Sequence, residues 1–127
     1  MDDLRRSELM EMYQEPTHRG QLTDPSISLQ KQHLFCGDKL NLFLKIEHGV
    51  ISDAKFDGEL CFVSTVSAEL LLEELIGQSV VVVRQFDQAR LLEILNLNLS
   101  TSRIACATLI LKALQEALEQ YESTKHL

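Results

Sequence analysis

No run of about 18 consecutive apolar residues, the length that a membrane-spanning helix needs, occurs in the sequence. The N-terminus, MDDLRRSELMEMYQEP, is charged throughout and lacks the apolar segment of a secretory signal peptide. Positive charge is also scarce, since 12 Lys and Arg stand against 19 Asp and Glu and the net charge is −7. These absences exclude a membrane span and predict a leaderless cytoplasmic protein that binds neither nucleic acid nor membranes.

Several functional motifs are missing as well. The sequence contains no glycine-rich phosphate-binding loop, no Ser-His-Asp nucleophile motif and no internal repeat. What is present is a chain of 127 residues that is 45% hydrophobic, which is enough to bury a sizeable core without disulfides. The length predicts one domain over residues 1–127.

Hydrophobic periodicity predicts an α+β fold, because strand patterns come first and helical patterns follow. An amphipathic helix and a turn-prone, flexible linker are expected over residues 1–25. We predict a three-stranded antiparallel sheet with helices packed on one face. The expected strands are 27–35, 40–46 and 50–56, and the expected helices are 2–13, 64–76, 87–95 and 103–122, while 80–83 is open between a strand and a helical turn.

The three cysteines, Cys36, Cys61 and Cys106, are an odd number, which in a leaderless chain is typical of a reducing compartment. Intervals of 25 and 45 residues separate them, so none belongs to a Cys-x-x-Cys site. A single free cysteine is most often a small buried hydrophobe. Each of these three, however, lies at the boundary of a predicted element or in the first turns of a helix, so the thiols can converge.

Three thiolates and one further ligand would complete the tetrahedral set that Zn²⁺ prefers. Asp38 follows Cys36 by two residues and is the first candidate for the fourth ligand, while His33 is a competitor that falls within a predicted strand. Thiolates are soft donors that suit zinc and the iron of iron–sulfur clusters. The residues alone leave two interpretations open, a metal site and three inert core cysteines.

Three segments carry a resemblance to a known family. Cys36-Gly37-Asp38, the stretch from Asp53 to Cys61, and the stretch from Arg103 to Leu109 look like the signature segments of the IscU/SufU/NifU N-terminal family. Met12-Tyr13-Gln14-Glu15-Pro16 followed by His18-Arg19-Gly20 also resembles the opening of that family. The resemblance covers roughly residues 4–122.

The resemblance implies an IscU/SufU-like fold and the role of a scaffold and sulfur acceptor rather than a stand-alone enzyme. Cys36, Asp38, Cys61 and Cys106 match the family's ligands for zinc, iron or a [2Fe–2S] cluster. The three thiols match positions that accept persulfide sulfur from a cysteine desulfurase, and Arg103, one helical turn before Cys106, is a candidate to stabilise a thiolate. Apo iron–sulfur proteins are the implied recipients, and a cluster-bound homodimer is a further implication.

Two branches of the family stay open. Arg103, Thr108 and Lys112-Ala113-Leu114 resemble the SufU branch, which holds zinc, whereas the 45-residue interval from Cys61 to Cys106 lacks the SufU insertion and resembles the IscU branch. Ala105 and the proline-free segment 97–103 depart from the IscU pattern, so docking of the IscU chaperone is not expected. We expect iron–sulfur cluster assembly, with a zinc-dependent sulfurtransferase partner or a zinc module without sulfur transfer as alternatives.

Other polar residues receive structural interpretations. Glu69, Glu73 and Glu74 are expected on a solvated helix face, and Tyr13 is expected in a packing contact. His18, His48 and His126 lie in predicted turns or in the tail and are assigned no role.

Overall fold

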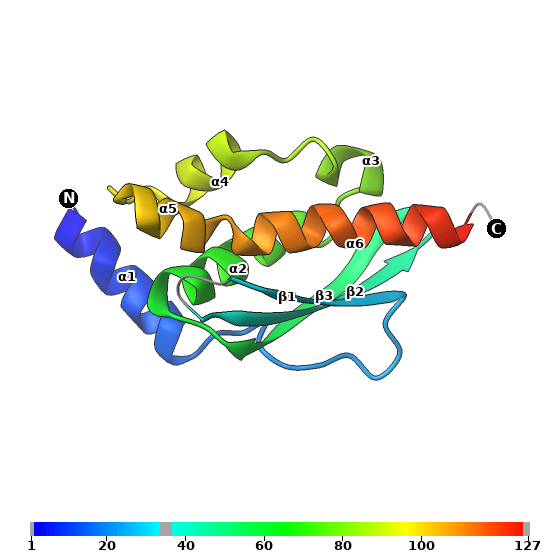
Figure 1. Ribbon diagram of the computed structural model, residues 1–127, viewed down its shortest axis with the longest axis horizontal. Coiled ribbons are helices and arrows are strands. Elements are labelled where there is room, and N and C mark those ends of the chain that lie inside the picture. Colours follow the sequence, from blue (N-terminus) through cyan, green and yellow to red (C-terminus); the bar gives the residue numbers. More distant parts are fainter. Residues whose placement is uncertain (1, 34–36, 126–127) are drawn as a thin grey trace.

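A three-stranded antiparallel sheet is covered on one face by helices in the computed structural model, which describes residues 2–33 and 37–125 (Figure 1). The strand order is β1-β2-β3, so each strand lies beside its neighbour in the chain. This is the predicted α+β fold. The elements are α1 (Asp2–Gln14), β1 (Ile27–Gln32), β2 (Lys39–Glu47), β3 (Val50–Glu59), α2 (Phe62–Leu75), α3 (Val80–Val83), α4 (Gln88–Leu95), α5 (Thr101–Ala107) and α6 (Leu109–Lys125).

The sheet buries one face because its apolar side chains recur at every second position. Along β2 the inward side chains are Leu40, Leu42, Leu44 and Ile46, and Phe56 on β3 is fully buried with them. A register shift opposite Lys45 and Ile46 makes Ser52 the extra residue of a bulge. The bulge explains why Ile51 and Ala54, three residues apart, both face the core.

The hairpin between β2 and β3 turns at His48 and Gly49, and both residues have positive φ angles of 54° and 75°. Two consecutive left-handed residues form the type I′ turn, whose twist matches that of the adjoining strands. Glu47 and Val50 pair directly across this turn. The predicted hairpin is therefore confirmed.

Helix α2 lies at the centre of the helical layer and is apolar on nearly all sides. It contacts α1, α4, α5, α6 and β3, which explains why its sequence shows little amphipathic pattern. Helix α6 packs over β1 and β2 on the same face. In Figure 1 the start of α2 and the whole of α5 lie at the end of the molecule where α1 is found.

Some boundaries differ from the predicted ones. The predicted helix 103–122 is two helices, α5 and α6, separated at Thr108, whose hydroxyl donates to the carbonyl of Ala105. Strand β3 continues to Glu59, and the ambiguous segment 80–83 is the one-turn helix α3. Strand β1 ends at Gln32, and residues 34–36, including Cys36, lie outside the described residues, as does His126.

In the part of the chain that the structure describes, every helix is too short or too polar to cross a lipid bilayer.

Candidate metal centre

Asp38, Cys61 and Cys106 come from three separate segments and meet at one end of the sheet. A carboxylate oxygen of Asp38 and the Sγ atoms of Cys61 and Cys106 all lie within 4.8 Å of one another. Asp38 immediately precedes β2, Cys61 immediately precedes α2, and Cys106 lies in α5. Three of the four predicted ligands are thus brought together, and the fourth, Cys36, falls in the segment outside the described residues.

Cys61 is the N-cap of helix α2. Its backbone is extended, and its Sγ accepts a hydrogen bond from the N–H of Ser64 at 3.4 Å. The carbonyl of Cys61 accepts the first bond of the helix, from the N–H of Thr65 at 2.9 Å. The Sγ of Cys61 is thereby held at the start of α2, where the N–H of Cys61 also contacts Asp38.

Asp38 is a buried carboxylate with only 5% of its surface exposed. The N–H of Cys61 donates to its Oδ1 at 3.2 Å, and the hydroxyl of Ser64 donates to its Oδ2 at 2.5 Å. Buried polar groups of this kind are costly unless they are hydrogen-bonded, and here both oxygens have a donor. Each carboxylate oxygen still has lone-pair capacity for a cation.

Cys106 is 4% exposed, which fits the buried environment of a small hydrophobe as well as that of a ligand. Its position is set by the packing of α5 against α2, and its carbonyl oxygen lies 3.1 Å from the hydroxyl of Ser64. Ser64 therefore touches all three members of the cluster, since its Oγ is also 3.4 Å from the Sγ of Cys61.

The donor set fits a soft or borderline divalent cation. Two thiolates and a carboxylate would place three negative charges within a few ångströms, and buried charges persist only when they are paired or bound to a metal. Sulfur donors select zinc or iron over magnesium and calcium, which prefer oxygen alone. Cys36, two residues before Asp38 in the sequence, stays the predicted fourth ligand of a tetrahedral site.

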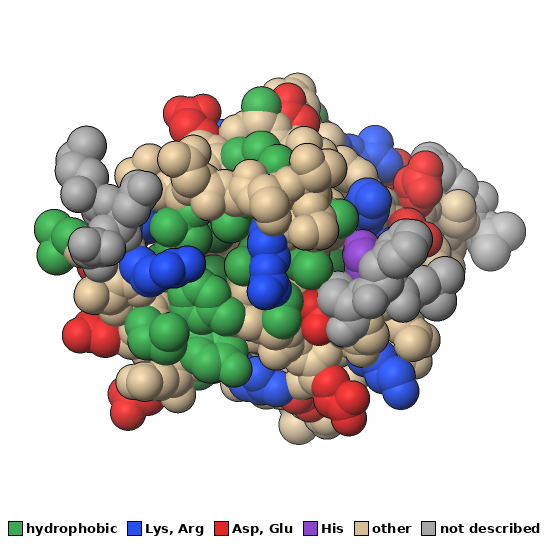
Figure 2. Space-filling model, turned by 60° about the vertical axis from the view of Figure 1, so that its left-hand side comes forward, with side chains coloured by type: hydrophobic (Ala, Val, Ile, Leu, Met, Phe, Trp, Pro, Cys, Tyr) green, Lys and Arg blue, Asp and Glu red, His purple; other side chains and the backbone are tan. Residues whose placement is uncertain are grey.

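Arg103 lies on the exposed surface beside this cluster. It lines a hollow of about 310 Å³ together with Phe62 and Val63, which directly follow Cys61, and with Arg6 of α1. The remaining lining residues are Leu97, Asn98, Leu99 and Ser100. Figure 2 turns this end of the molecule toward the viewer and shows apolar side chains gathered there with Lys and Arg side chains among them. The stabilisation of a thiolate by Arg103 stays a prediction.

Two residues of α2 have contacts that the sequence did not predict. Ser64 received no role, although its position three residues after Cys61 is that of a capping residue. Glu69 was expected on a solvated face, and that prediction is wrong, because Glu69 is buried and accepts hydrogen bonds from Thr17 and His18. His18 therefore has a partner in the fold, and Tyr13 makes the expected packing contact, an edge-on ring contact with Phe62.

Comparison with known proteins identifies the family of the chain. Residues 4–126 match the family described as the NifU-like N terminal domain. The iron–sulfur cluster assembly scaffold protein IscU of Thermotoga maritima is 33% identical over 118 residues, which cover 80% of this chain and 83% of the relative. The zinc-dependent sulfurtransferase SufU of Bacillus subtilis is 28% identical, with 96% and 94% of the two chains covered.

The fold is shared with a solved structure as well. The N-terminal part of a nitrogen-fixing NifU-like protein from Brucella abortus superposes with a TM-score of 0.72 over 96% of each chain at 20% identity. The match over nearly the whole chain, the identity with the Thermotoga relative and the shared fold lead to one conclusion. The chain belongs to the family of NifU-like N-terminal domains.

Proposed function

We propose that this protein is an iron–sulfur cluster assembly scaffold, acting as one domain over residues 1–127. It accepts sulfur from a cysteine desulfurase and holds iron or a [2Fe–2S] cluster through Cys36, Asp38, Cys61 and Cys106. The observation that carries the proposal is the convergence of Asp38, Cys61 and Cys106, whose ligand atoms lie within 4.8 Å of one another. The similarity to the IscU protein of Thermotoga maritima supports it.

Sulfur transfer needs a thiolate nucleophile, and Cys61, at the start of α2, is the candidate for that role. The thiolate attacks the outer sulfur of the desulfurase persulfide, a new S–S bond forms, and the S–S bond of the donor breaks. The donor cysteine leaves as a thiolate and the acceptor becomes a persulfide, so sulfur moves without a net change of oxidation state. Cys61 is the most accessible described thiol, because Cys106 is buried.

Asp38 distinguishes this site from an all-cysteine site. A carboxylate is a harder donor than a thiolate, so it binds zinc or the iron of a cluster as a weaker and more exchangeable ligand. Such a ligand suits a scaffold whose iron and sulfur are cargo that must leave. We propose that Asp38 promotes release to apo iron–sulfur proteins, and that a cluster is shared between two copies of the chain.

A second candidate function is that of a zinc-dependent sulfurtransferase partner of a desulfurase. The observation that favours it is the similarity to SufU of Bacillus subtilis, which extends over 96% of this chain. The same four side chains would then hold one zinc ion, and Arg103 beside Cys106 would stabilise the thiolate that receives sulfur. A cytoplasmic location is part of both proposals, because free thiols persist in a reducing compartment.

Anaerobic reconstitution and metal analysis of the purified protein separate the two candidates. Incubation with ferrous iron, sulfide and thiol is expected to produce the visible absorbance of a [2Fe–2S] cluster if the scaffold proposal holds. One tightly held zinc per chain, no cluster and stimulation of a cysteine desulfurase would instead support the sulfurtransferase. Single Cys36→Ser, Cys61→Ser and Cys106→Ser variants are expected to lose cluster or metal.

Asp24→Ala is a matched control for Asp38→Ala, because the Asp24 side chain is 91% exposed and lies away from the cluster. Asp38→Ala is expected to bind free metal ions less tightly but to hand its cluster to an added apo acceptor more slowly than the wild-type protein, and Asp24→Ala is expected to match the wild type. Faster loss from Asp38→Ala would contradict the exchangeable-ligand role. If the three serine variants bind metal as well as the wild type does, both metal functions fail.

A further inference from the structure

Ser64 occupies the centre of the candidate metal centre without being one of its predicted ligands. Its side chain is 3% exposed, and its Oγ lies 2.5 Å from Oδ2 of Asp38, 3.4 Å from Sγ of Cys61 and 3.1 Å from the carbonyl oxygen of Cys106. A hydroxyl has a single proton to donate and two lone pairs to accept with. The shortest of these contacts, to the charged carboxylate, is the one that takes the proton, since hydrogen bonds to ionised acceptors are shorter and stronger.

The contacts form a helix cap that is built from two segments. In an ordinary capping box, the side chain at the third helical position reaches back to the N–H of the N-cap residue. Here Ser64 holds that third position in α2, but its hydroxyl turns to Asp38, and Asp38 accepts the N–H of the N-cap residue Cys61. Asp38 therefore supplies from the start of β2 the carboxylate that a local glutamate would supply in a standard box.

This arrangement fixes the carboxylate plane of Asp38. The Cys61 N–H holds one oxygen and the Ser64 hydroxyl holds the other, so the side chain cannot rotate without losing a donor. Because each oxygen retains a free lone pair, the two donors orient the carboxylate and do not block it. Residues that orient a ligand in this way are typical of metal sites, and their loss weakens metal binding.

We propose that Ser64 is the positioning residue of this centre, which holds Asp38 in the orientation that ligates zinc or iron. This inference rests on the proposed function, since it assumes that Asp38 is a ligand. The hydroxyl of Ser64 affects metal binding through Asp38 and does not coordinate the metal itself. Removal of the hydroxyl leaves Oδ2 buried without its side-chain donor and lets the carboxylate turn.

The test is a metal-binding titration of four proteins, the wild type, Ser64→Ala, Asp38→Ala and the double variant. The dissociation constant is measured with Co²⁺, whose thiolate complexes absorb visible light, and then with Zn²⁺ by competition with a chelator. Ser64→Ala is expected to weaken binding on the order of 10- to 100-fold. In the Asp38→Ala background the same change is expected to alter the constant less than about threefold, because the residue through which Ser64 acts is absent.

Ser67→Ala is the matched control. Ser67 lies one turn further along α2, is fully buried, and has no hydrogen-bond partner for its hydroxyl among the described residues. Loss of the Ser67 hydroxyl deprives no acceptor of its donor, so metal affinity is expected to stay at the wild-type value. Ser64→Thr, which keeps a hydroxyl, is expected to restore most of the affinity that Ser64→Ala loses.

The outcomes distinguish positioning of Asp38 by Ser64 from an effect of Ser64 on Cys61 or on packing. An equal loss in the wild-type and Asp38→Ala backgrounds would overturn the proposal, because Ser64 would then act through Cys61 or through packing. Unchanged affinity in Ser64→Ala, or failure of this variant to fold where Ser67→Ala folds, would overturn it as well. A wild-type protein that binds neither Co²⁺ nor Zn²⁺ would instead refute the proposed function itself.

Discussion

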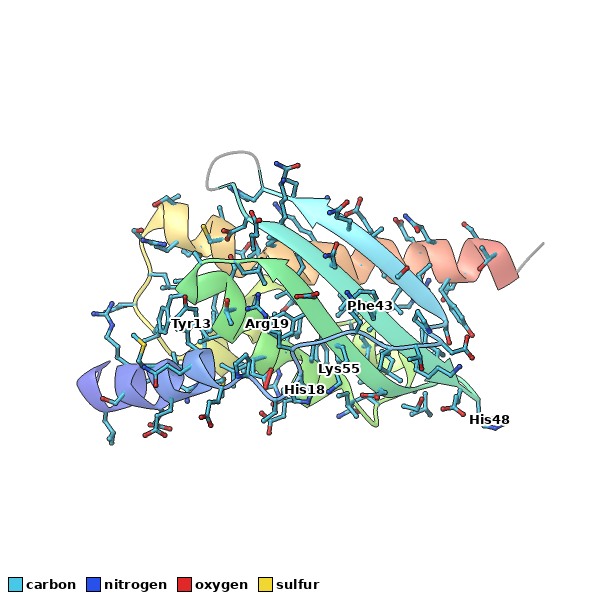
Figure 3. All side chains as sticks on the ribbon, turned by 90° about the horizontal axis from the view of Figure 1, so that it is seen from below. Tyr13, His18, Arg19, Phe43, His48 and Lys55 are labelled. Carbon is cyan, nitrogen blue, oxygen red and sulfur yellow. The ribbon has the colours of Figure 1, made fainter. Side chains whose placement is uncertain are left out.

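The imidazole Nδ1 of His18 lies 2.9 Å from Oε1 of Glu69, a carboxylate that is only 2% exposed on helix α2. The same carboxylate accepts hydrogen bonds from the N–H and hydroxyl of Thr17 and from the N–H of His18. The segment 18–20 is also hydrogen-bonded to strand β3. The N–H of Phe56 donates to the carbonyl of His18, and the N–H of Gly20 donates to the carbonyl of Phe56. Figure 3 shows His18 and Arg19 with Lys55 of β3 close by. Through these hydrogen bonds, Glu69 holds residues 17 and 18 against helix α2, whose N-cap is Cys61.

Glu69→Gln is expected to destabilise the protein, because the amide replaces one of the oxygens that accept the backbone N–H groups of Thr17 and His18 with a donor. We expect a loss on the order of 2–3 kcal/mol in the free energy of unfolding, measured by urea denaturation. Faster hydrogen exchange at the amides of Thr17 and His18 is expected to accompany it. Glu73→Gln, on the exposed side of the same helix, is the control and is expected to change little. Equal losses of unfolding free energy in Glu69→Gln and Glu73→Gln would contradict this role of Glu69.

Arg5 joins α1 to the end of α4. Its guanidinium donates to the carbonyl of Leu95 at 3.0 Å and to that of Ile94 at 2.7 Å, two of the carbonyls that a helix leaves without partners at its C-terminus. Arg5→Ala is expected to lower the free energy of unfolding by about 1–2 kcal/mol. The neighbouring Arg6→Ala, in an exposed side chain, is expected to have a smaller effect in the same urea titration. If Arg6→Ala lowers the free energy of unfolding more than Arg5→Ala does, the stabilising role of Arg5 at the end of α4 is contradicted.

Gly58 of β3 pairs with Leu40 of β2 and leaves no room for a side chain. A Cβ atom at Gly58 would stand 2.0 Å from the carbonyl oxygen of Lys39, and its φ angle is +127°. Gly58→Ala is expected to cost about 2–4 kcal/mol and to weaken metal binding, because Lys39 adjoins Asp38 and β3 leads into Cys61. Gly77→Ala is the control, because Gly77 also has a positive φ angle, +92°, but an added Cβ atom would meet no neighbouring atom. Its effect therefore measures backbone strain without a steric clash. If Gly58→Ala lowers the free energy of unfolding no more than Gly77→Ala does, the predicted clash with Lys39 is contradicted.

Metal loading is expected to raise the melting temperature. A cation that binds only the folded state at 100 times its dissociation constant adds about 2.7 kcal/mol, which for a chain of this size is on the order of 10 °C. Excess chelator is expected to reverse the shift in a thermal melt, and Cys61→Ser is expected to abolish it. A zinc-dependent shift that persists in Cys61→Ser would place the metal elsewhere.

Much of the fold follows from local patterns. The alternation in β2 and the glycine after His48 were enough to predict the hairpin, and the change to helical periodicity located α2. The three cysteines and Asp38 were singled out by their positions at element boundaries and by a family resemblance. Three of these four residues meet in the described structure.

What the sequence did not reveal depends on contacts between distant segments. Glu69 shares its helix with Glu73 and Glu74, and its burial follows from partners 51 and 52 residues away. The boundary between α5 and α6 at Thr108 falls within an otherwise continuous helical pattern, so periodicity alone does not locate it. The role of Ser64 becomes visible only once Asp38, 26 residues earlier, is seen in contact with its hydroxyl.

The cap that Asp38 completes on α2 has a consequence for chain entropy. A cation held by Asp38, Cys61 and Cys106 would close two consecutive loops, of 23 and 45 residues, in the manner of a disulfide that can be opened and reformed. Loading would tie the hairpin of β2 and β3, the central helix and α5 into one cross-linked unit, and the gain in stability would come mainly from the restricted unfolded chain. Release of the cargo would remove this restriction and lower the free energy of unfolding.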